Sequence, residues 1–524
     1  MTLGTLVMNI GIASVILTAI MAFMYKDRIN SWVMSFIQNF CGILFVFSGW
    51  VKAVDPLGTA YKMEQYFDEF YSTFEATWFG FIAPIFPVFS KYAIWFSVFM
   101  IVFEIVLGVM IIIGARTKLA SWMFLLLVAF FTVLTGFTYL TGYVPNEANF
   151  FQFGSWTEFN SNNMKVQDCG CFGDFIKLEP KVSFFKDIFL LFPSVYFVLA
   201  YRQMHELFSK QVRNGIVGVS LIALLVYCFS NYIWDLPHTD FRPFKKGADV
   251  RMVREAEEDA MAAVQITHYK LKNKETEEVV MVPYDEYLKD YTAKYKGAYE
   301  TLEQVKGEPS IKPTKISDFE ITDLEGNDLT YDILYNEEAH FLVVNYMLKG
   351  DPQKATRMVQ DSVFQIDTVI TFDAEIPAKL KQLGRKTKEG EAVDMTGLED
   401  MIDTSIVKSF VEIVEKEESY IDQNFSKSYL AKHTDILKPF TDAAKADNRP
   451  VLMAIGKSDP VAIMQFDEQT GLGIDYGMAD DILLKTIVRS NPGVVLWKNG
   501  KILDKWHIGK LPSYEEVKAK YLQD

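Results

Sequence analysis

The chain has 524 residues, half of them hydrophobic and 23% charged, a balance that excludes a disordered or low-complexity protein. The net charge of -15 argues against a nucleic-acid partner, and four cysteines are too few for a disulfide-stapled scaffold. The length exceeds that of one ordinary domain.

Charge and cysteines divide the chain unevenly. The first 240 residues hold 14 Lys and Arg against 16 Asp and Glu, out of 52 and 67 in the whole chain, so most of the negative charge lies further on. All four cysteines lie in the first part. We predict a transmembrane domain over residues 1–240, a spacer over 241–315 and an α/β domain over 316–524.

Six apolar stretches in the first domain are long enough to cross a bilayer as helices, which takes about 20 residues. The first is an anchor and not a cleaved signal peptide, because its basic residues follow the apolar run and do not precede it. The stretches are Leu6–Met24, Trp32–Val54, Tyr92–Gly114, Leu119–Leu140, Ser183–Tyr201 and Gly215–Trp234.

Basic residues between these stretches predict the orientation, because short cytoplasmic connections are enriched in Lys and Arg. Three connections carry such residues and are expected inside: Lys26 with Arg28, Arg116 with Lys118, and Arg202 with Lys210 and Arg213. The connections at 55–91 and 141–182, both termini and everything after Pro237 are then expected outside.

The sharpest local motif is Asp-Cys-Gly-Cys-Phe-Gly-Asp at residues 168–174, before the fifth stretch. Two cysteines at this spacing can reach disulfide distance, and a small strained ring favours exchange. Cys169 and Cys171 are therefore candidates for a redox pair, with a static disulfide or a metal site as alternatives. We expect Asp168 and Asp174 to raise the pKa of the thiols.

Glu104 lies near the middle of the third stretch, where a carboxylate is costly and is a candidate for function. Its partner is expected to be Lys52, Ser48 or a ligand hydroxyl. The alternative is a buried pair that only fixes helix packing. Cys41 and Cys228 are expected to act as small hydrophobic residues within their helices.

Three segments of the membrane domain carry a family resemblance. Phe45–Lys52 with Asp55-Pro56, and Phe103–Gly108 with Gly114–Thr117, resemble two spans of the DoxX/MauE superfamily, and Cys169–Gly173 resembles the MauE-type cysteine motif. The resemblance implies a four-helix bundle made by the second to fifth spans. It also implies a link to periplasmic disulfide formation and to quinones, with roles for Lys52, Glu104, Cys169 and Cys171.

The spacer is expected to contain a charged helix at Val250–Val264 and a hairpin of Ile266–Leu271 with Glu278–Val282. A helical segment over Tyr284–Val305 follows in this prediction. Pro309 and Pro313 then mark a linker.

Beyond residue 316 strands and helices alternate. The predicted elements include an entry hairpin of Phe319–Asp323 with Asp328–Tyr331, buried strands at Phe341–Leu348 and Val451–Ile455, and a helix near Thr434–Ala446. A second hairpin joins Val494–Trp497 to Lys501–Trp506 through Asn499-Gly500, and Ser513 with Glu516 forms a capping box.

This order resembles the thioredoxin fold in its TlpA-like branch, with Pro492 of Ser490–Val494 as the structural cis-proline. The position of the active dithiol reads Lys349–Gln353 and has no cysteine. The domain is therefore expected to bind partners without thiol chemistry. A large insertion at about 354–428 is predicted to be helical, with an acidic amphipathic segment around Leu398–Tyr420.

The sequence thus predicts an α-helical membrane bundle of about six spans joined to a thioredoxin-like α/β domain, in the bacterial inner membrane. We expect thiol-disulfide exchange at Cys169 and Cys171, coupled to a quinone near Glu104 and Lys52. Membrane lipid and a periplasmic protein are the expected partners, and no metal is expected. The alternative is a non-enzymatic envelope scaffold, or a subunit of a membrane complex, with a structural disulfide.

Overall fold

The computed structural model describes residues 2–166, 169–372, 375–384, 396 and 402–523. Two compact units emerge. The first comprises Met1–Leu348, Ser428–Ile463 and Asp467–Asp524, and the second comprises Lys349–Lys427 with Met464–Phe466.

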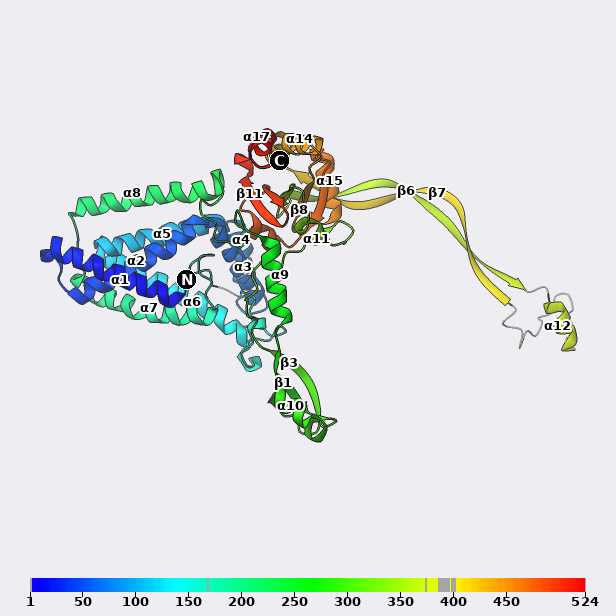
Figure 1. The fold of residues 1–524 in the computed structure, drawn as a ribbon, viewed down its shortest axis with the longest axis horizontal. Helices are drawn as coiled ribbons and strands as arrows, with labels where there is room; N and C mark the ends of the chain where they lie inside the picture. Colours follow the sequence, from blue (N-terminus) through cyan, green and yellow to red (C-terminus); the bar gives the residue numbers. More distant parts are fainter. Residues whose placement is uncertain (1, 167–168, 373–374, 385–395, 397–401, 524) are drawn as a thin grey trace. The chain divides into compact units, whose positions relative to one another are not determined.

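Six helices of the first unit are long and apolar enough to cross a membrane, so the chain is an integral membrane protein. α2 packs on α5 and α6 packs on α7, while α1 contacts α2 and α8 contacts α5 and α2. The six apolar stretches of the sequence are confirmed as helices: α1 (Leu3–Met24), α2 (Trp32–Val54), α5 (Ala93–Ile113), α6 (Thr117–Leu140), α7 (Pro180–Ala200) and α8 (Lys210–Phe229) (Figure 1).

The connection between α2 and α5 is itself helical, which the sequence analysis missed. α3 (Pro56–Glu75) and the short α4 (Ile85–Lys91) occupy it, and α3 packs on α5. Asp55 caps α3 by accepting a hydrogen bond from the Gly58 amide at 3.0 Å, with Pro56 at the first helical position. The Asp-Pro pair was therefore a helix-start signal.

The spacer region begins with α9 (Val250–Ala262) and continues as a three-stranded sheet in the order β2-β1-β3. β1 (Ile266–Asn273) and β2 (Val279–Pro283) form the predicted hairpin. The predicted helix over 284–305 is only partly right. α10 (Tyr284–Asp290) and a π-helical turn end at Tyr295, and β3 (Tyr299–Lys306) pairs with β1.

A six-stranded mixed sheet follows, in the order β11-β10-β5-β8-β9-β4. β5 is parallel to β8 and β8 to β9, whereas β10 is antiparallel to both β5 and β11, and β4 is antiparallel to β9. The strands are β4 (Thr322–Asp323), β5 (His340–Asn345), β8 (Val451–Ile455), β9 (Asp475–Met478), β10 (Gly493–Lys498) and β11 (Lys501–His507).

Helices cover this sheet and bury its centre. Every residue of β5 is buried, and Trp497 of β10 is fully buried against Phe319 in the same core. The helices are α11 (Thr330–Leu334), α13 (Lys427–Ala431), α14 (Lys438–Ala446), α15 (Pro460–Thr470), α16 (Asp481–Ile487) and α17 (Tyr514–Tyr521).

Local turn and cap signals of this region are present in the structure. Asn499 and Gly500 both have positive φ between β10 and β11, and Ser513 with Glu516 caps α17 reciprocally. The Asn491–Pro492 peptide bond is cis, directly before β10. The predicted entry hairpin is much shorter than expected, because only the bridge between Thr322 and Asp328 forms and α11 begins at Thr330.

The prediction of a helical insertion is wrong. The described part of the second unit consists mainly of two long antiparallel strands, β6 (Gly350–Phe372) and β7 (Ile402–Phe425), and also contains the short helix α12 (Ile376–Gln382). The run from Ser362 to Phe372 is rich in Val, Ile and Thr, which favour extended chain. Part of the predicted acidic amphipathic segment, residues 398–401, lies outside the described residues.

Candidate functional site

A buried ion pair joins the two helices that pack most extensively in the membrane domain. Lys52 Nζ of α2 lies 2.7 Å from Glu104 Oε2 of α5, and the two side chains are 8% and 3% exposed. The helices can approach closely because Gly108 has no side chain at their contact. A Cβ at that position would lie only 2.8 Å from the Gly42 carbonyl oxygen. Of the partners considered for Glu104, the structure provides Lys52.

The cysteine loop follows a tight turn against α2. Gly170 and Gly173 have positive φ, and the Gly173 amide donates to the Gly170 carbonyl at 3.1 Å. Ser48 Oγ of α2 donates to the Cys171 carbonyl at 2.9 Å, which anchors the loop to the helix that carries Lys52. Cys169 is buried, Cys171 is half-buried and both are thiols in the structure.

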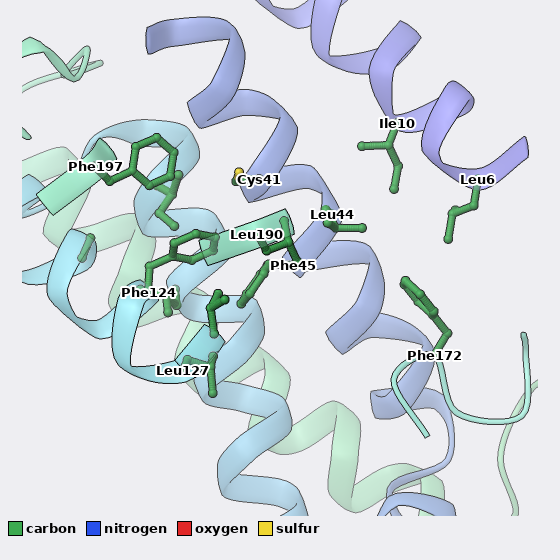
Figure 2. Close-up of a cluster of buried hydrophobic side chains, with 14 of the residues drawn as sticks. Leu6, Ile10, Cys41, Leu44, Phe45, Phe124, Leu127, Phe172, Leu190 and Phe197 are labelled. Atoms are coloured by element: carbon green, nitrogen blue, oxygen red, sulfur yellow. The ribbon is translucent and has the colours of Figure 1, made fainter. Parts of the chain in front are cut away.

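Phe172 fixes the loop to the apolar core of the membrane domain. Its side chain is 1% exposed and its ring centroid lies 6.4 Å from that of Phe47. Figure 2 shows Phe172 extending from the loop into the cluster that also contains Leu6 and Ile10 of α1 and Leu44 of α2. Burial of this aromatic ring holds the neighbouring cysteine at a defined place.

A second ion pair, which the sequence analysis missed, lies on α7. Lys186 donates to Asp187 Oδ1, and Thr135 Oγ1 of α6 donates to Asp187 Oδ2 at 3.0 Å. The Asp187 side chain is 2% exposed. A carboxylate inside an apolar stretch was the available signal, the same one that pointed to Glu104.

One cavity of about 510 Å³ connects these groups. Lys52, Glu104, Lys186, Asp187 and the cysteine loop all line it. Apolar side chains from four helices complete the wall, and the residues are Leu44, Phe45, Val51, Met100, Ile101, Val128, Phe131, Leu134 and Leu190. The structure therefore gathers the four candidate residues Lys52, Glu104, Cys169 and Cys171 around a single space.

The cavity also borders the α/β region through two cations that the sequence analysis missed. Arg489 lies 2.8 Å from Asp55 and 3.3 Å from Asp174, and Lys485 of α16 lies 3.2 Å from Glu64 of α3. Both cations also stand over the ring of Tyr61, at 5.1 and 4.5 Å from its centroid. No local pattern marks such pairs, because each joins residues hundreds of positions apart.

Burial is the main influence on the reactivity of Cys171. It raises the pKa of the thiol, whereas the Lys186 ammonium lowers that pKa and the Asp187 carboxylate raises it. Asp174, which was expected to raise the pKa of the thiols, pairs with Arg489. Asp168 lies outside the described residues.

The remaining candidates stand apart from the cavity walls. Cys41 and Cys228 are fully buried in separate apolar clusters of α2 and α8, as expected of small hydrophobic residues. Pro492 precedes β10, and its neighbour Asn491 donates to the Met347 carbonyl at 2.9 Å, after the end of β5. Among the described residues, no three His, Cys, Asp or Glu are arranged to hold a metal ion.

Comparisons with known proteins place part of this site in a family context. Residues 30–146, which include α2, α3 and α5, match the family model described as "Methylamine utilisation protein MauE". The chain matches no curated protein and no solved structure. The match, together with the membrane helices, indicates a membrane protein in a redox or methylamine-utilisation context.

Proposed function

We propose that this protein is a thiol-disulfide exchange protein of the bacterial inner membrane, with Cys169 and Cys171 as the exchanging pair. The observation that carries the proposal is the cavity that joins the cysteine loop to the buried pair of Lys52 and Glu104. A loop held by Ser48 and Phe172 against the membrane helices keeps both sulfurs beside this cavity.

The exchange conserves electrons and atoms. A client thiolate attacks one sulfur of the oxidised Cys169–Cys171 pair, so that a mixed disulfide forms as the original S–S bond breaks. The second client thiolate then attacks the mixed disulfide, which leaves the client oxidised by two electrons and the two cysteines as thiols. The reverse sequence reduces a client disulfide.

A lipid quinone fits the cavity by the chemistry of its walls. The apolar side chains suit a ring with a lipid tail, and the ammonium groups of Lys52 and Lys186 can donate hydrogen bonds to carbonyl oxygens. When bound, a quinone would accept the two electrons and two protons that the dithiol releases. The chain's part is to orient this acceptor and to hold compensating charge at Lys52 and Glu104.

We also propose that the α/β region is a thioredoxin-like module that binds a periplasmic partner without thiol chemistry. Support comes from the strand order β11-β10-β5-β8-β9, with parallel central strands and Pro492 before β10. No cysteine follows Cys228 in the chain. The contacts of Arg489 with Asp55 and Asp174 favour a role close to the cysteine loop.

Thiol trapping in cells tests the exchange. Cys169→Ser and Cys171→Ser are each expressed, free thiols are blocked with acid and an alkylating agent, and mixed disulfides are sought on non-reducing gels. One variant is expected to accumulate a partner adduct that a reductant removes. Cys228→Ser is the matched control and is expected to trap nothing.

The opposite outcome would favour a scaffold with a structural disulfide. In that case neither variant traps a partner, and the wild-type pair stays oxidised whatever the respiratory state.

An excess of Lys and Arg in three connections supports a periplasmic cysteine loop and α/β region. Membrane-impermeant maleimide is therefore expected to label Lys274→Cys in intact cells and to spare Lys118→Cys; the reverse pattern would invert the orientation.

A further inference from the structure

Lys186 and Asp187 form a second charged pair on the cavity wall, and the proposed exchange gives neither residue a role at the sulfurs. They are consecutive on α7 and paired with each other, and the Lys186 side chain is 17% exposed. The Asp187 carboxylate is held on its other oxygen by Thr135 of α6. Two helices therefore fix the pair, so the ammonium has a defined position at the wall.

The Lys186 ammonium lies beside the cysteine loop. Its Nζ stands 6.0 Å from the centroid of the Phe172 ring, the residue that follows Cys171. Cys171 lines the same cavity and is half-buried, so a charge on its sulfur would be only partly hydrated. A sulfur in that setting needs a nearby cation to exist as a thiolate.

Most of the charged groups described around the sulfur are paired with one another. Lys52 and Glu104 form one pair and Lys186 and Asp187 the other, so each ammonium faces one carboxylate. Arg489 engages Asp174 of the loop, and Lys62 Nζ of α3, near Gly170, donates to Gln65. Loss of the Cys171 proton therefore adds one negative charge, and the ammonium groups of Lys186 and Lys52 are the cations that act on it.

We propose that Lys186, held in place by Asp187 and Thr135, is a positioning residue that stabilises the thiolate of Cys171. Asp187 orients the ammonium and also opposes the thiolate by its own charge. This inference rests on the proposed exchange, because it names the group that makes one of its sulfurs nucleophilic. Lys186 and Asp187 are adjacent on one helix but are expected to have opposite effects on the stability of the Cys171 thiolate.

The test is the pH dependence of Cys171 alkylation by iodoacetamide in the full-length Cys169→Ser protein in lipid nanodiscs. Alkylation forms an S–C bond as iodide leaves, and mass spectrometry quantifies the Cys171 peptide between about pH 7 and about pH 11. Lys186→Met is expected to move the profile to higher pH and to slow the reaction on the order of tenfold at a given pH. Lys186→Arg is expected to restore the alkylation profile of the parent Cys169→Ser protein.

Asp187→Asn is expected to move the profile in the opposite direction. Lys181→Met, an exposed lysine on the same helix, is the matched control and is expected to change nothing. If Lys186→Met does not fold, Lys186→Met/Asp187→Asn removes both charges and is still expected to raise the pKa, because Lys186 acts on the thiol more than Asp187 does.

Two results would overturn the inference. One is a Lys186→Met profile that matches that of Lys181→Met, and the other is a shift of the same sign in Lys186→Met and Asp187→Asn. Neither client nor quinone is present in this measurement. Failure here therefore leaves the trapping result in cells intact, and failure of trapping leaves the alkylation profile intact.

Discussion

Arg489 and Asp55 form an ion pair across 434 residues of chain, with Arg489 Nε 2.8 Å from Asp55 Oδ2. The same guanidinium reaches Asp174 of the cysteine loop at 3.3 Å, and its residue is 4% exposed. Burial lowers the pKa of Arg489, but the charges of Asp55 and Asp174 raise it above its ordinary value. A permanently charged group therefore connects the end of α2, the cysteine loop and the α/β region.

Removing this cation is expected to destabilise the protein strongly. Arg489→Leu leaves Asp55 and Asp174 without their shared partner, and breaking a buried pair costs about 3 kcal/mol. Thermal unfolding of the detergent-solubilised protein is the measurement. Lys501→Leu, which breaks the more exposed pair with Asp249, is the control and is expected to cost well below about 1 kcal/mol. Equal losses would contradict a special role for Arg489.

Removing one charge of the pair of Lys52 and Glu104 is expected to reduce folding more than removing both charges. Lys52→Met leaves a buried carboxylate without its partner and is expected to reduce the folded fraction sharply. Lys52→Met/Glu104→Met removes both charges and is expected to recover it. Fluorescence-detected size exclusion measures the folded fraction. Loss of folding in the double variant as well would mean that the pair is needed for packing.

Glu104→Gln separates function from packing at the same position. The amide keeps an oxygen that can accept a hydrogen bond from Lys52, so the protein is expected to stay folded. Quinone-coupled reoxidation of the cysteine pair is expected to fall, as followed by thiol trapping over time. A variant that folds and reoxidises like wild type would remove Glu104 from the proposed site.

The stability of the α/β region is expected to depend on Asp240 at acid pH. Burial raises the pKa of Asp240, but Arg242 at 2.7 Å and Lys505 more than offset this and bring it to about 2. A depressed carboxyl pKa stabilises the fold at pH values above about 4, and this contribution disappears as the pH falls toward about 2. Its size is about 2 kcal/mol.

Asp240→Asn checks this dependence. Thermal unfolding is compared with wild type between about pH 2 and about pH 7, and the difference is expected to be largest at neutral pH and to shrink on acidification. A difference that stays constant across the range would show that the side chain acts through packing alone.

Gly500→Ala is expected to disturb the hairpin between β10 and β11. Gly500 has φ +73, and a Cβ there would stand 2.4 Å from Arg251 Cβ and 2.8 Å from the Leu334 carbonyl oxygen. Gly326→Ala is a matched control, because that residue also has positive φ but its Cβ would meet nothing within 4 Å. Gly500→Ala is expected to lose more stability on thermal unfolding than Gly326→Ala, by about 1 kcal/mol or more. Equal losses would show that the cost comes from the positive φ alone and not from the contacts of the new Cβ.

The sequence predicted what depends on local patterns. Six apolar runs became six helices, and the Asn499-Gly500 turn and the Ser513 cap follow from rules that act within a few residues. The closeness of Lys186 to the cysteine loop was missed because the two meet only after α7 packs. The insertion was misjudged because the acidic residues before Tyr420 favour a helix, whereas the Ile, Val and Thr residues of the same stretch favour the strand that forms.

Arg489 and Asp55 lie far apart in the sequence but in one chain, and this lowers the affinity that their contact must have. Both residues belong to one chain, so the association of the α/β region with the cysteine loop is intramolecular and takes place at an effective concentration that can reach about the millimolar range. A contact of a few ion pairs, too weak to join separate proteins, suffices under that condition. The fusion of the two regions in one polypeptide therefore lets a few ion pairs keep the α/β region beside the cysteine loop.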